Sequence, residues 1–190
     1  MTPVLGIIAS SVLGAVTATS FESIATVTGN GSATTLALDN IPSTYTHLQI
    51  RGIVRDARAT SDDTVQIYFN TDTSDANYAS HKLRGNGTAA SASSDIGGGN
   101  NIGLLVGAAA NTTASVYGGV VVDILDYTNT NKYTTVRSLG GFDANGSGFI
   151  ELRSGVWMNT AAVTKITFIN NGTAAFTDKT TFALYGVKSA

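Results

Sequence analysis

The chain has 190 residues, of which 13% are charged, and 11 Lys and Arg stand against 13 Asp and Glu. Charged residues are about half as frequent as in an average soluble protein, and Thr (27) and Asn (14) fill the polar positions instead. The even charge balance disfavours nucleic-acid binding, and the 43% hydrophobic content excludes a disordered chain. Without Cys there is no disulfide, no thiolate chemistry and no zinc ribbon.

The chain opens with an apolar stretch, residues 4–16, that Gly and Ser interrupt. No Lys or Arg precedes it, as a signal peptide would require, and the interruptions make it unsuitable for spanning a membrane. We expect residues 1–20 to form an extended arm that packs on a neighbouring subunit or partner protein; the alternative is a strand or short helix over the protein's own core. The contact residues of the arm are its aliphatic side chains, Val4, Leu5, Ile7, Ile8, Val12, Leu13 and Val16.

From Phe21 onward apolar residues recur with a period of two, which is typical of strands with one buried face. One set is Leu48, Ile50, Gly52 and Val54, and another is Val65, Ile67 and Phe69. The same pattern sets Ile150, Leu152 and Val156 against Glu151 and Arg153, so we expect the aliphatic side chains of that strand to be buried. Long helical periodicity is absent from the sequence.

The predicted strands are 21–28, 33–38, 45–55, 64–70, 78–84, 101–107, 114–125, 133–142, 148–157, 163–170 and 180–188. Asn-Gly pairs at Asn30, Asn86, Asn145 and Asn171 supply the positive φ angles of tight hairpin turns, so neighbouring strands should be largely antiparallel. We therefore predict an all-β fold over residues 21–190, a single antiparallel two-sheet β-sandwich that is jelly-roll-like. The Gly-, Ser- and Asn-rich stretch 86–101 is expected to be a surface loop, either functional or a simple connection.

No pattern of a catalytic or cofactor site is complete. Gly146-Ser147-Gly148 lacks the first Gly of a nucleophile elbow, and glycine-rich nucleotide motifs are absent. His47 and His81 are best explained as polar positions on strands. We expect no enzyme activity and no cofactor.

Acidic and aromatic residues leave weaker alternatives open. The stretch from Asp143 to Gly148 matches the start of a calcium loop, but the twelfth position is Ser154 and Glu151 comes three residues too early, so an Asn-Gly hairpin is preferred. Asp62, Asp63, Asp72 and Asp75 could flank a glycosidic bond, but acids in such loops are usually solvated. The aromatic residues Trp157, Tyr68, Tyr78, Tyr117, Tyr127, Tyr133 and Tyr185 could stack on sugars, although packing roles are simpler.

A resemblance to known proteins depends on six segments of the chain. They are 20–27 (SFESIATV), 41–52 (IPSTYTHLQIRG), 123–127 (DILDY), 132–137 (KYTTVR), 154–157 (SGVW) and 182–186 (FALYG). With the IIASS of the arm, they resemble a family of virion proteins of tailed bacteriophages that is frequent among aquatic and cyanobacterial phages. The resemblance spans nearly the whole chain and brings no catalytic residues.

This resemblance implies a structural protein of the virion, made in the host cytoplasm, that decorates or cements the capsid through its N-terminal arm. Its partners would be other virion proteins, above all the major capsid protein, and further copies of itself in a trimer or dimer. The alternative is a receptor- or carbohydrate-binding protein at a tail or fibre tip. A hydrolase of surface polysaccharide would need an acid pair that the sequence does not locate.

Overall fold

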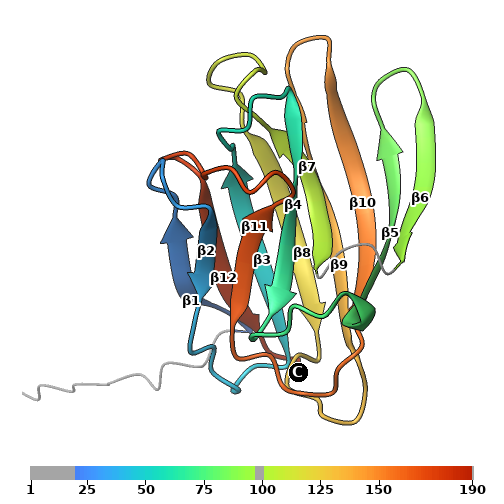
Figure 1. Cartoon of the computed structure of the whole chain (residues 1–190). Helices are drawn as coiled ribbons and strands as arrows, with labels where there is room; N and C mark the ends of the chain where they lie inside the picture. The colour runs from blue at the N-terminus through green and yellow to red at the C-terminus, as the bar shows by residue number, and fades with distance from the viewer. Residues whose placement is uncertain (1–19, 97–100, 190) are drawn as a thin grey trace, which may run out of the picture.

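The computed structural model describes residues 20–96 and 101–189, and these fold into twelve strands (Figure 1). The strands are β1 (Phe21–Thr28), β2 (Thr35–Leu38), β3 (His47–Val54), β4 (Asp62–Phe69), β5 (Tyr78–Gly85), β6 (Ala90–Ile96), β7 (Ile102–Ala108), β8 (Gly118–Leu125), β9 (Thr134–Asp143), β10 (Gly148–Trp157), β11 (Ile166–Asn170) and β12 (Thr181–Val187). One short 3₁₀ helix, Asp75–Asn77, precedes β5. The predicted arm residues from Val4 to Val16 lie outside the described residues.

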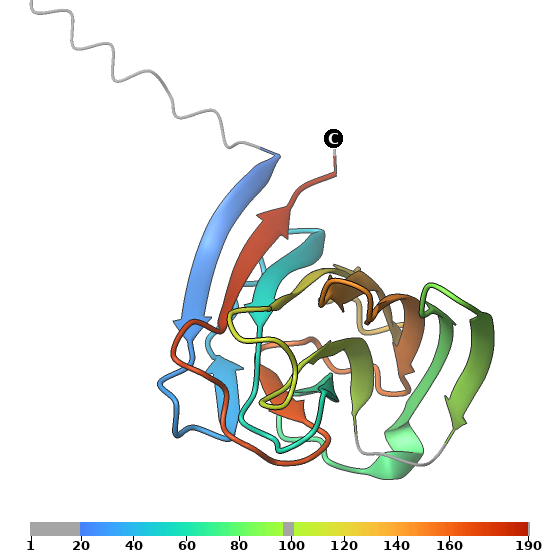
Figure 2. The same ribbon diagram turned by 90° about the horizontal axis from the view of Figure 1, so that it is seen from above.

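Two antiparallel sheets pack face to face, as predicted. The larger sheet has the order β1-β12-β3-β8-β9-β10-β5-β6 and the smaller has the order β2-β11-β4-β7. Strands β1 and β6 lie at opposite edges of the larger sheet, coloured blue and green in Figure 2. Strands β1-β12-β3-β8 face β2-β11-β4-β7 in the order of a jelly roll, so the jelly-roll prediction is confirmed.

Two hairpins enlarge this jelly roll. Hairpin β5–β6 is inserted between β4 and β7, and hairpin β9–β10 between β8 and β11. Strand β10 pairs with β5 and β9 pairs with β8, so the hairpins extend the larger sheet past β8 by four strands. We call these four strands, β9-β10-β5-β6, the extension.

The prediction of a loop over residues 86–101 is wrong for residues 90–96, which form strand β6, whereas residues 97–100 lie outside the described residues. Residues 86–89 form a turn, in which Oδ1 of Asn86 accepts hydrogen bonds from the amides of Thr88 and Ala89, and β6 follows. β6 pairs along its whole length with β5, from Ala90 opposite Gly85 to Ile96 opposite Ala79. Backbone pairing at a sheet edge needs no apolar side chains, and for that reason the hydrophobic pattern does not reveal this strand.

Only two of the four Asn-Gly pairs close hairpins. Asn145 and Gly146 both have positive φ, 58° and 106°, in the β9–β10 turn, and Gly87 has a φ of 86° in the β5–β6 turn. The pairs at Asn30 and Asn171 instead follow β1 and β11, and there the chain crosses to the other sheet.

The core lies between the sheets and is rich in aromatic rings. Trp157, Tyr78 and Tyr127 are almost fully buried, as expected for packing residues. Phe168 of the smaller sheet stacks on Phe182 of the larger at 3.9 Å between ring centroids, and this contact ties the two sheets together. Such burial makes the sandwich a rigid platform for its outer surfaces.

Candidate interaction surface on the extension

The outer face of the larger sheet exposes aliphatic side chains. Leu83 of β5, Leu152 of β10, Leu139 of β9 and Val121 of β8 lie directly opposite one another across four strands. We call these four residues the apolar row. Ile150 and Ile53 belong to the adjacent row, which otherwise contains Ala90, Gly85, Gly141, Gly119, Thr181 and Thr28. All six large aliphatic side chains are between 41% and 62% exposed.

The two faces of strand β10 are reversed relative to the sequence prediction: the face predicted to be buried is exposed. Ile150 and Leu152 point outward, whereas Glu151 and Arg153 are buried, with 0% and 2% exposure. Alternation tells which residues share a face but not which face is covered. Here the covered face contains the charges.

An ion-pair cluster makes that burial possible. Glu151 Oε2 accepts hydrogen bonds from the amide of Val106 at 2.9 Å and from Nε of Arg153 at 2.8 Å, and Nε of Arg84 lies 3.6 Å from Oε1. Gly103 of β7 leaves room for the Arg153 guanidinium, since a Cβ there would overlap Nη1. The charged groups are therefore paired on the covered face, although Oε1 of Glu151 accepts no hydrogen bond from the described residues, and the aliphatic side chains of β10 face outward.

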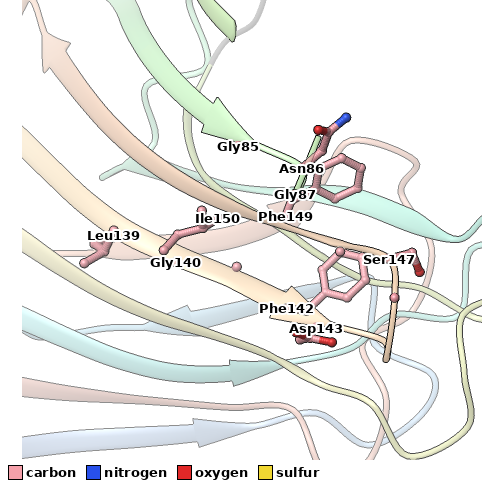
Figure 3. Close-up of a pocket in the computed structure, with 13 residues that line it drawn as sticks. Gly85, Asn86, Gly87, Leu139, Gly140, Phe142, Asp143, Ser147, Phe149 and Ile150 are labelled. Atoms are coloured by element: carbon pink, nitrogen blue, oxygen red, sulfur yellow. The ribbon is translucent and has the colours of Figure 1, made fainter. Parts of the chain in front are cut away.

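Two hollows lie along β10 on the outer face. The first has a volume of about 640 Å³ and lies between the β5–β6 turn and the β9–β10 hairpin (Figure 3). Leu139, Ile150 and several glycines line it, with Asn86, Asp143 and Ser147 among its polar residues. The second has a volume of about 540 Å³, and its lining includes Leu83, Leu152 and Ala92 as well as His81 and Arg137. Together they form what we call the outer trough.

The walls of the outer trough suit the burial of apolar groups. Four of the residues lining the first hollow are glycines of β5, β9 and β10, Gly85, Gly140, Gly141 and Gly148, so backbone lies close to the surface there. Asp143 lies at one end of the trough, and the ionisable residues that line the second hollow are His81, Lys82, Arg137 and Arg153. The stretch between them, around Leu139, Ile150 and Leu152, carries no charged side chain on the outer face.

The acids considered for catalysis or calcium have structural contacts. Asp63 is buried and accepts hydrogen bonds from Arg58, from its neighbour's amide and from the amide of Gly172. Asp72 accepts hydrogen bonds from Nε1 of Trp157 and Nδ2 of Asn77. Oδ1 of Asp143 accepts a hydrogen bond from the amide of Asn145 within the β9–β10 turn. Among the described residues, no group of three or more His, Asp or Glu could hold a metal ion.

The two histidines lie on strands, as expected. Nδ1 of His47, at the start of β3, accepts a hydrogen bond from the amide of Asp126 at 2.9 Å. His81 of β5 is exposed at the end of the outer trough, four strands away from His47 in the larger sheet. The structure does not bring them together.

One buried acid was not singled out from the sequence. Asp56 follows β3 and is 1% exposed; its Oδ1 accepts a hydrogen bond from the amide of Arg58, and its Oδ2 makes none to any described residue. Burial raises the pKa of Asp56 to about 6, with the nearby Asp63 carboxylate adding to the effect. A lone Asp in a loop gives no sequence signal for such burial.

Comparison with known proteins adds no identification: no family model, curated protein or solved structure matches this chain. In the part of the chain that the structure describes, no helix is long and apolar enough to cross a membrane.

Proposed function

We propose that this protein is a non-enzymatic structural protein of a tailed-phage virion, which decorates or cements the capsid through its N-terminal arm. The observation that carries the proposal is the outer trough with its apolar row. A contiguous exposed aliphatic surface of this kind is typical of a protein that is covered by a partner when it works. The proposed location in a phage virion depends on the sequence resemblance to virion proteins.

The partners we propose are the major capsid protein and further copies of the chain. A shell offers many identical sites, so clustered copies gain avidity without any single strong contact. The low charge of the chain suits permanent apolar contacts rather than electrostatic steering.

Charges placed in the arm test this function. Replacing Leu5, Ile8 and Leu13 with Asp should abolish attachment to particles, since three carboxylates cannot be buried in an apolar site. Attachment is measured by co-sedimentation of the full-length variant with virions or capsids that lack their own copies. The matched control places the same three Asp residues at Asn111, Thr113 and Thr130, which are exposed loop positions. Unchanged attachment of the arm variant would remove the arm as the anchor.

A receptor- or carbohydrate-binding role at a tail tip is the second candidate. It is favoured by the position of the first hollow at the end of the sandwich, where Asn86, Asp143 and Ser147 are the polar residues of its lining. Copy number separates the two functions. Hundreds of copies per virion favour the shell, and a few dozen or fewer favour the tail.

A further inference from the structure

We propose that the outer trough of one copy binds residues 4–16 of a second copy, and that this contact links neighbouring copies. This inference rests on the proposed function, because it names where the anchoring arm docks. Three features carry it: the chemistry of the trough, the chemistry and length of the segment, and the edge at which the segment joins the sheet.

The trough and the segment are chemically matched. The middle of the trough offers Leu139, Ile150 and Leu152 around glycine backbone and no outward charged side chain. The first 21 residues contain no Asp, Glu, Lys or Arg, and residues 4–16 hold seven Val, Leu and Ile side chains. Each surface would cost free energy if it stayed in water, and neither the segment nor the outward side chains in the middle of the trough carry a charge that would oppose burial against the other.

Their lengths also match. Along β10, the two hollows extend from Gly148 to Ser154, a distance of about 20 Å at 3.3 Å per residue. Thirteen residues span about 20 Å as a helix and about 43 Å as an extended strand. The trough can therefore hold the whole segment in a helical form, or half of it in an extended form.

Geometry favours a second copy over the chain's own trough. The segment joins β1, and five strand spacings of about 4.8 Å separate β1 from β10, about 24 Å in all. Crossing them would use about seven extended residues, 13–19, and would leave Leu13 and Val16 outside the trough. The surface on the way carries Arg51, Gln49 and Asp123. A neighbouring copy can receive all seven aliphatic side chains.

Cysteine cross-linking tests this docking cleanly, because the chain has no Cys of its own. Full-length Ile8→Cys, carrying an affinity tag, is mixed with untagged full-length Leu152→Cys and oxidised at micromolar concentration. We expect a disulfide-linked heterodimer on a non-reducing gel that disappears on reduction. The matched control replaces Leu152→Cys with Thr26→Cys, an exposed position on β1 at the opposite edge of the same sheet, and should give no such product.

The other outcomes overturn the inference. Equal heterodimer yield with Thr26→Cys would show random collision, and no heterodimer with Leu152→Cys would show that the trough does not receive the segment. As a second measurement, Leu152→Lys in otherwise unchanged protein should abolish the oligomer in sedimentation while keeping the thermal unfolding midpoint. Both assays use purified protein without particles. Loss of particle attachment by the arm variant with negative cross-linking would therefore leave the proposed function standing and remove only this docking site.

Discussion

At the scale of single residues, Gly103 controls the charged interior of the extension. Gly103→Ala would push a methyl group into the Arg153 guanidinium and weaken its pairing with Glu151. We expect a loss of about 3 kcal/mol in the free energy of unfolding, because breaking a buried ion pair leaves a charge buried without its partner. Urea unfolding measures this loss. Gly119→Ala is the control, since a Cβ at that strand position meets no atom within 4 Å; equal effects of the two substitutions would contradict this role.

Through Asp56, the free energy of unfolding changes with pH in the opposite direction to that expected for an acid in an ion pair. Its pKa is about 6 in the folded protein and near 3.8 when unfolded, so the folded state binds the proton first as the pH falls. Stability from this group is therefore gained as the pH falls from 6 to 4, and lost as the pH rises through 6, by up to about 3 kcal/mol.

The variant Asp56→Asn isolates this effect. Its side-chain carbonyl can still accept the hydrogen bond from the amide of Arg58. The difference in unfolding free energy between the original chain and the variant should change with pH between 4 and 6 and stay constant above 7. A difference that is flat over the whole range would show that Asp56 titrates normally.

At the scale of elements, all eleven strands that the alternation predicts are present, because a half-buried strand must alternate. β6 was missed because Ala and Ser at a sheet edge pair through the backbone alone. The exposure of Ile150 and Leu152 was predicted wrongly, because Gly103, on a strand distant in sequence, opens the space that admits Arg153. The apolar row could not be predicted either, since it depends on the register of four strands that come together from separate parts of the chain.

At the scale of the whole molecule, we expect a closed homo-oligomer, with a trimer ahead of a dimer. Its contacts should be apolar, because Leu83, Leu139, Ile150 and Leu152 are exposed side by side along the outer trough. Screening weakens charge pairs and leaves apolar contacts intact, so the oligomer should persist from low to molar salt. Sedimentation of the purified protein at micromolar concentration measures this. A monomer at both salt concentrations contradicts the oligomer, and dissociation at high salt contradicts its apolar basis.

The position of β12 has a consequence for synthesis of the protein. β12 lies between β1 and β3, so β1 has no partner in its sheet until β12 has been made. Translation of the roughly 150 residues between them takes about 8–30 s at 5–20 residues per second. During that time β1 has no hydrogen-bonded partner strand in its sheet, and residues 1–20, which contain no charged side chain, precede it. An unpaired strand edge favours aggregation, so we expect the nascent chain to be most prone to aggregation before its last strand emerges and pairs with β1.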